Sequence, residues 1–91
     1  MENLKETLAV LPKEPGVYIY RNAEKTVIYV GKAVDLSRRV RQYFQREDAV
    51  GKKTVRLVAE INSIETIPTT SEFDALLLEA KLIRQYMPKY N

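Results

Sequence analysis

The chain has 91 residues, which is enough for one small domain with a single core, and its formal net charge is +3. It contains no cysteine and no histidine, which excludes disulfide bridges, zinc sites of the Cys/His type and catalysis by a thiolate or an imidazole. Any metal ion must therefore be held by oxygen. Residues 1–6 lack the character of a signal peptide and no apolar stretch reaches the length of a membrane span, so we expect a soluble, cytoplasmic protein that does not contact membranes.

The positive charge is concentrated in one segment. Residues 32–56 contain eight basic and three acidic side chains, whereas the rest of the chain contains seven basic and nine acidic ones. A local excess of five positive charges is typical of a surface that meets phosphate groups, because Lys and Arg displace the counterions of nucleic acids. A solvated helix face would produce the same pattern, so charge alone leaves both readings open.

The first half of the chain predicts a short helix followed by a β-hairpin. Leucines at helical spacing predict a helix over residues 3–11. Residues 16–21 and 26–31, which are rich in β-branched residues and tyrosine, predict two strands joined by a turn at 22–25. We expect Gly31 to end the second strand.

The register of this hairpin decides which side chains meet. A symmetric turn centred between Ala23 and Glu24 places Tyr18 directly opposite Tyr29. Alternation along the strands then gives one tyrosine face and one aliphatic face. The aliphatic face is expected to consist of Val17, Ile19, Ile28 and Val30. We therefore expect two phenols to lie together on one side of the sheet.

The middle of the chain predicts two further helices and a third strand. Asp35 is a suitable N-cap for a helix that runs to about Arg46. A second helix is expected over about 52–62 and a strand over 63–70. Pro68 lacks an amide hydrogen, so that strand should lie at an edge of the sheet or carry a bulge.

The last predicted helix begins with Ser71 and Asp74 as a capping pair and ends at Pro88. Within it, Glu79 has only apolar neighbours at i−4, i−3, i+3 and i+4, which are Ala75, Leu76, Leu82 and Ile83. A carboxylate on an apolar face must be protonated, paired with a cation or bound to a metal ion. A buried ion pair with Arg or Lys, an extension of the carboxylate toward water, or a Mg²⁺ or Mn²⁺ site would satisfy it.

Lys32 follows Gly31, and we expect its ammonium to return toward the tyrosine face. A neighbouring cation stabilises a phenolate, which Tyr29 needs if it is to accept a proton near neutral pH. The alternative is a cross-strand pair of aromatic rings, with Tyr18 and Tyr29 hydrogen-bonded and no chemistry.

The helix after the hairpin carries the other candidate residues. Arg39 offers a planar fork suited to a phosphate in its transition state, and Tyr43 lies one turn later on the same side. Five further basic residues could contact flanking DNA phosphates or only water: Arg38, Arg41, Arg46, Lys52 and Lys53.

These residues carry a resemblance to the GIY-YIG nuclease family, whose two name motifs correspond here to Gly16-Val17-Tyr18 and Tyr29-Val30-Gly31. The chain most resembles the branch of the family that acts in bacterial nucleotide excision repair. That likeness rests on Glu14-Pro15-Gly16-Val17-Tyr18, Tyr29-Val30-Gly31-Lys32-Ala33, Leu36, Arg39-Val40-Arg41, Tyr43-Phe44, Leu78-Glu79-Ala80, Leu82-Ile83 and Pro88-Lys89-Tyr90-Asn91.

The resemblance implies an α+β fold in which helices flank a three-stranded antiparallel sheet, formed by residues 1–91 as one domain of a longer protein. It also implies a metal-dependent DNA endonuclease that cuts on the 3′ side of a lesion in double-stranded DNA delivered by other excision-repair subunits, with the domain monomeric. In this family Tyr29 would be the general base, Lys32 its support, Arg39 the phosphate ligand and Glu79 the ligand of one Mg²⁺ or Mn²⁺. Tyr18, Tyr43 and Asn91 would complete the site.

Two other functions remain open at this point. The chain could be a DNA-binding or protein-docking module that keeps the fold without cutting. It could also belong to another branch of the family, such as the structure-selective or homing enzymes. A nick that depends on Mg²⁺ or Mn²⁺ separates the first alternative from an enzyme.

Overall fold

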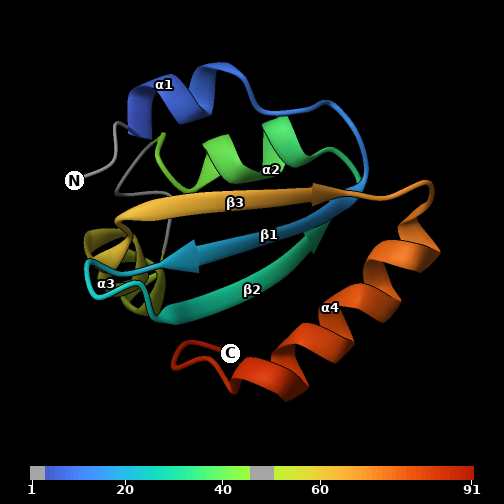
Figure 1. Cartoon of the computed structure of the whole chain (residues 1–91). Helices are drawn as coiled ribbons and strands as arrows, with labels where there is room; N and C mark the ends of the chain where they lie inside the picture. The colour runs from blue at the N-terminus through green and yellow to red at the C-terminus, as the bar shows by residue number, and fades with distance from the viewer. Residues whose placement is uncertain (1–3, 46–50) are drawn as a thin grey trace.

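A three-stranded antiparallel sheet in the order β2-β1-β3 forms the centre of the structure, a computed structural model that describes residues 4–45 and 51–91 (Figure 1). The strands are β1 (Gly16–Arg21), β2 (Val27–Ala33) and β3 (Ser63–Pro68). Both outer strands pair with β1 in antiparallel fashion. The α+β prediction is confirmed, as is the edge position of the strand that ends in proline.

Helices cover both faces of this sheet. The helices are α1 (Leu4–Ala9), α2 (Leu36–Gln42), α3 (Lys52–Glu60) and α4 (Glu72–Tyr86). Figure 1 shows α1 and α2 together on one side of the sheet, whereas α4 runs along the other side, where it packs against β2 and β1. No helix in the described part of the chain is long and apolar enough to cross a membrane.

The predicted helix caps are confirmed. The carboxylate of Asp35 accepts a hydrogen bond from the amide of Arg38 at 3.1 Å, and the hydroxyl of Ser71 accepts one from the amide of Asp74 at 3.1 Å. Each bond satisfies an amide that the first turn of a helix leaves without a partner. The helix after Asp35 ends at Gln42, earlier than predicted, and Arg46 lies outside the described residues.

The register of the hairpin differs from the predicted one by two residues. Tyr18 lies opposite Gly31, and Tyr20, not Tyr18, lies opposite Tyr29. The turn closes asymmetrically because Lys25 adopts a left-handed conformation with φ 66°, and the register shifts again between Tyr20 and Arg21. A two-residue shift preserves the alternation of side chains, so Tyr18 and Tyr29 still share a face.

The side chains of Ile28 and Lys32 lie on the opposite face of the sheet from the one predicted. The bulge turns Ile28 toward the tyrosine face, and Val27 takes its place on the aliphatic face. Strand β2 continues two residues beyond Gly31, so Lys32 is a regular strand residue opposite Val17. Lys32 therefore lies on the face covered by α4, and the prediction that it returns toward the tyrosines is wrong.

The sheet separates two cores of different chemistry, where a single core was expected. On the α4 face the core is aliphatic and includes Val17, Ile19, Val30 and Ala75. On the other face the core contains Tyr18 and Tyr20 together with residues from α1, α2 and α3. The candidate site lies where this tyrosine-containing core reaches β2, an edge strand.

Candidate active site

Four tyrosine rings form a cluster on the face of the sheet covered by α1 and α2. Tyr18 and Tyr20 come from β1, Tyr29 from β2 and Tyr43 from the C-cap of α2. Their ring centroids lie 5.2–6.3 Å apart. The hydroxyl groups of Tyr18 and Tyr43 share a hydrogen bond of 2.9 Å. The structure thus brings together three of the predicted site tyrosines and adds Tyr20.

Gly31 makes room for this cluster. A Cβ atom at position 31 would overlap the ring and the hydroxyl oxygen of Tyr18, which stands directly across from it. The absence of a side chain therefore lets the Tyr18 phenol extend over β2. The tyrosine of the first name motif and the glycine of the second depend on each other sterically.

The guanidinium of Arg39 lies at the edge of the cluster. Its Cζ atom is 5.2 Å from the ring centroid of Tyr43, which confirms that these residues share one side of α2. Its Nη1 also donates a hydrogen bond to Oε1 of Gln42 at 3.2 Å. Arg39 is exposed, so these contacts hold a cation beside the phenols while leaving it accessible to a phosphate.

Burial dominates the acidity of the phenols. Desolvation raises the pKa of Tyr29 to about 12 and the pKa of Tyr43 to about 12, even though Arg39 acts in the opposite direction. Desolvation also raises the pKa of Tyr18. All three phenols are therefore neutral near pH 7, and Tyr29 could accept a proton only after further positive charge had lowered its pKa.

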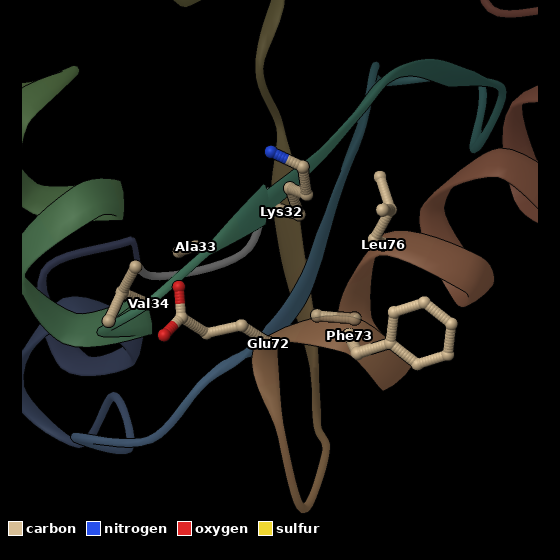
Figure 2. Close-up of a pocket in the computed structure, with 7 residues that line it drawn as sticks. Lys32, Ala33, Val34, Glu72, Phe73 and Leu76 are labelled. Atoms are coloured by element: carbon tan, nitrogen blue, oxygen red, sulfur yellow. The ribbon is translucent and has the colours of Figure 1, made fainter.

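Lys32 lines a pocket on the α4 face. The pocket has a volume of about 340 Å³, and Figure 2 shows Lys32 of β2 beside Glu72, Phe73 and Leu76 of α4. Lys32 is exposed and is separated from the phenol cluster by the sheet. The cation next to Tyr29 is thus Arg39, and any action of Lys32 must come from around the edge of β2.

Glu79 is half-buried on α4 and has a free carboxylate. Of its four apolar neighbours, Ala75 is buried and Leu76 is 44% exposed, so Glu79 lies where the packed side of the helix meets solvent. Its side chain makes no hydrogen bond or ion pair within residues 4–45 and 51–91. The predicted alternative of a buried ion pair is therefore not observed, whereas the alternative of a carboxylate that extends toward water fits this position.

This carboxylate fits a sparse metal site. No group of three or more Asp, Glu, His or Cys side chains that could hold a metal ion occurs in the described part of the chain. Mg²⁺ commonly takes one or two carboxylates and keeps several water ligands. A single free carboxylate suits that donor set, whereas a fully enclosed site such as that of structural zinc would not.

Asn91 is bound to the free edge of β2. Its Oδ1 accepts a hydrogen bond from the Val30 amide at 2.9 Å, and its Nδ2 donates to the Val30 carbonyl at 2.8 Å. The Tyr90 amide donates to the carbonyl of Ile28 at 3.0 Å. These bonds hold the backbone on both sides of Tyr29, a contact that residue patterns did not reveal.

The predicted DNA-binding residues fall into separate groups. Arg41 uses Nε and Nη2 to hold the Leu8 carbonyl of α1, at 3.2 and 2.7 Å, so part of its guanidinium has a structural role. Arg38 is exposed on α2, and Lys52 and Lys53 are exposed at the start of α3. Arg46 lies outside the described residues.

Tyr20 is the member of the cluster that sequence reasoning missed. It is fully buried, its ring packs against those of Tyr18, Tyr29 and Tyr43, and burial strongly raises its pKa. Its position two residues after Tyr18 on one strand was the available signal, because such residues share a face.

Comparison with known proteins first defines the class. Residues 14–91 match a family model described as "UvrC-like GIY-YIG domain". A crystal structure of the GIY-YIG N-terminal endonuclease domain of UvrC from Thermotoga maritima, bound to magnesium as its catalytic divalent cation, has a TM-score of 0.87 and 41% identity. The alignment covers 100% of this chain and 98% of that one. A point mutant of the same domain, with tyrosine replaced by phenylalanine, also binds the cation and matches with a TM-score of 0.87 and 40% identity.

Curated relatives give the particular family. The chain is 48% identical over 91 residues to the UvrABC system protein C of Alkaliphilus metalliredigens and 53% identical over 90 residues to that of Bacteroides fragilis. These matches cover 100% and 99% of the chain but 15% of each relative. The chain belongs to the UvrC-like GIY-YIG domain family.

Proposed function

We propose that the chain is a divalent-metal-dependent endodeoxyribonuclease domain that makes the 3′-side incision in nucleotide excision repair. The observation that carries the proposal is the cluster of neutral phenols beside the accessible Arg39 guanidinium, in a chain that is 41% identical to a UvrC endonuclease domain bound to magnesium. Its substrate would be double-stranded DNA containing a lesion, delivered in the cytoplasm by the other subunits of the UvrABC system.

In this mechanism each residue acts on one phosphodiester at the β2 edge. Tyr29 acts as its phenolate: after its own proton has passed to solvent, the phenolate oxygen takes a proton from the attacking water. The hydrogen-bonded pair of Tyr18 and Tyr43 packs beside it and fixes its ring. Arg39 holds the phosphate oxygens, whose charge is greatest in the transition state, so its effect falls chiefly on kcat.

Glu79 is the residue that would hold the single divalent ion, Mg²⁺ or Mn²⁺. When bound, the ion would supply the positive charge that acidifies the water and the Tyr29 phenol and that offsets charge on the departing oxygen. This requires Glu79 of α4 and Tyr29 of β2 to reach the same phosphate around the edge of the sheet. The free carboxylate and the edge position of β2 favour that convergence.

The test compares Tyr29→Phe and Glu79→Gln in a nicking assay on lesion-containing duplex with Mg²⁺ or Mn²⁺. Loss of a general base costs about 10²- to 10⁴-fold in rate, and we expect a decrease of that size for Tyr29→Phe. Calorimetry should show that this variant still binds Mn²⁺. Glu79→Gln should lose both nicking and Mn²⁺ binding. Tyr86→Phe, which changes a phenol outside the cluster, and Glu24→Gln, in the hairpin turn, are the matched controls.

The dependence on pH gives a second measurement. Because the pKa of Tyr29 is raised, the nicking rate should increase with pH until the phenol in the loaded site is ionised. Tyr29→Phe should remove this increase from the residual activity. Nicking by Tyr29→Phe at the parent rate would disprove the role of the phenol, and binding of DNA without any nick would favour the non-catalytic module.

A further inference from the structure

A polar pocket lies beside α2, and none of the four clustered tyrosines lines it. It has a volume of about 440 Å³, and its lining includes Lys13, Asp35, Ser37, Arg38, Arg41 and Gln42. Arg38 and Arg41 were predicted to contact flanking DNA phosphates or only water, and the candidate active site described above gives this pocket no ligand. Lys13, which precedes the hairpin, was not among the candidate residues of the sequence.

The backbone places Lys13 at this pocket. The Ser37 amide donates to the Pro12 carbonyl at 2.9 Å, and the Leu36 amide donates to the Glu14 carbonyl at 2.9 Å. These two bonds hold the residues on either side of Lys13 against the start of α2. The ammonium therefore extends from an anchored segment of backbone, which reduces the conformational entropy that a ligand would have to remove.

The charges of the pocket select an anion. The side chains of Lys13 and Arg38 make no hydrogen bond or ion pair with any residue that the structure describes. The Asp35 carboxylate is engaged by the amide of Arg38, and Arg41 is engaged in part by the Leu8 carbonyl. Three positive groups against one negative group leave a net charge of +2 with two free cations, which suits a phosphate.

The pocket is continuous with the candidate active site through Gln42. Gln42 lines the pocket and accepts the hydrogen bond from Arg39, whose guanidinium lies over Tyr43. Because Gln42 is bonded to the Arg39 guanidinium, it marks where the reacting phosphate would lie. Arg38 precedes Gln42 by four residues on α2, which is about 6 Å along the helix. Nucleotides of one DNA strand advance about 3.4 Å along the duplex axis, so phosphates one or two nucleotides apart span a similar length.

We propose that this pocket binds a backbone phosphate of the cut strand, one or two nucleotides from the phosphodiester held by Arg39, with Lys13 and Arg38 as its ligands. The inference rests on the proposed function, which places the reacting phosphate at Arg39. It implies that α2 sets the direction of the strand: one side of the helix holds the reacting phosphate and the adjacent side holds its neighbour.

Binding to uncut duplex without divalent metal tests this inference separately from catalysis. Fluorescence anisotropy between about 50 and 200 mM salt gives the slope of log K against log salt, and removal of one phosphate contact lowers its magnitude by about 0.9. We expect that decrease for the Lys13→Ala/Arg38→Ala double variant. Lys13→Arg should keep the slope of the parent. Lys81→Ala, an exposed charge on α4, is the matched control and should leave the slope unchanged.

A duplex carrying one neutral methylphosphonate locates the contact. Placed one or two nucleotides from the cut, the neutral linkage should weaken binding of the parent chain and of Lys81→Ala, but cause no further loss in the double variant. In nicking assays the double variant should raise KM and leave kcat near the parent value.

The outcomes separate the two proposals. A double variant that retains the parent salt slope, or that loses affinity on methylphosphonate substitution as the parent does, overturns the phosphate subsite even when the chain nicks DNA. A parent chain that never nicks while the double variant shows the expected decrease in slope overturns the nuclease proposal and supports the subsite as a DNA contact.

Discussion

The side chains on the two faces of strand β1 are equally buried but differ in chemistry. Val17 and Ile19, which face α4, are 0% and 2% exposed, and Tyr18 and Tyr20, which face α1 and α2, are 1% and 0% exposed. The α4 face is a dispersive aliphatic core, whereas the tyrosine face contains four hydroxyl groups in a packed environment. Burial alone therefore does not identify a site in this domain.

The two faces differ in the substitutions that they accept and in the partners that their side chains need. An aliphatic core gains stability from area and volume and accepts changes that preserve both. A buried hydroxyl must find a partner or lower the stability, and within the described residues Tyr18 and Tyr43 satisfy each other while Tyr20 has none. We interpret the tyrosine face as a scaffold that gives up some stability to fix the orientation of Tyr29.

The largest effect is expected for Gly31→Ala, which strikes the tyrosine face directly. The added methyl group would overlap the Tyr18 ring, so the ring must move and its hydrogen bond with Tyr43 must break. Overpacking of this kind typically costs about 1–3 kcal/mol, and the broken hydrogen bond adds about 0.5–1.5 kcal/mol. Nicking should fall with the loss of geometry around Tyr29. Chemical denaturation and the nicking assay measure the two effects.

Gly51→Ala is the matched control for that substitution. A Cβ atom at position 51 meets nothing within 4 Å, and the residue has an ordinary φ of −77°. We expect a cost below about 1 kcal/mol, since alanine is only a poorer N-cap than glycine, and no change in nicking. Equal losses for the two variants would contradict the steric role of Gly31.

The hairpin illustrates what the sequence could and could not predict. Alternating side chains were sufficient to place Tyr18 and Tyr29 on one face, because a shift of two residues leaves the faces unchanged. The register itself was wrong because Lys25, with φ 66°, closes the turn in a conformation for which glycine or asparagine is the usual signal. The bulge that reorients Ile28 has no residue signature in this chain.

Alkaline unfolding is the next expected effect, and it again concerns only the tyrosine face. The folded-state pKa of Tyr29 and that of Tyr43, both about 12 because of burial, exceed the value near 10 of an unfolded tyrosine. The neutral phenols thus stabilise the folded state fully below about pH 10, and this contribution is lost as the pH rises toward 12. We expect Tm to fall by at least ~4 °C over that interval, measured by circular dichroism.

Tyr43→Phe sharpens this measurement. It removes one phenol with a raised pKa, so the decrease in Tm between pH 10 and 12 should become smaller, whereas Tyr86→Phe should leave it unchanged. The ultraviolet absorbance of phenolate should show that some tyrosines ionise only when the chain unfolds. Free titration of all six tyrosines near pH 10 in the folded state would contradict the burial of the cluster.

The positions of candidate site residues were predictable where a pattern placed them on a regular element. Helical spacing paired Arg39 with Tyr43, and apolar neighbours marked Glu79. Lys32 was assigned to the wrong face because Gly31 was read as the end of a strand, whereas it is an interior residue kept small by the Tyr18 ring. Only the family resemblance named Asn91, because its partner, Val30, is 61 residues away and is bound through backbone atoms, which no residue pattern reveals.

A moderate effect is expected for Asn91→Ala, at the edge where the two faces meet. The substitution removes two hydrogen bonds to Val30, each worth about 0.5–1.5 kcal/mol, so the free energy of unfolding should fall by about 1–3 kcal/mol. Hydrogen exchange of the Val30 amide should become faster. Lys89→Ala, which removes an exposed ion pair with Glu60, is the control and should leave that amide protected.

The smallest effect, and the one with the opposite sign, is expected for Tyr20→Phe. Its hydroxyl is buried without a partner in the described residues, so removing it eliminates a desolvation cost while the ring still fills its space. We expect the free energy of unfolding to stay level or to rise by up to about 1 kcal/mol. Ile19→Val, the adjacent residue on the other face, also removes one group and should instead cost about 0.5–1.5 kcal/mol through lost packing. A loss of stability in Tyr20→Phe would mean that the hydroxyl has a partner. Changes of opposite sign in the free energy of unfolding at two neighbouring residues would establish that the faces differ in kind, because both residues are equally buried.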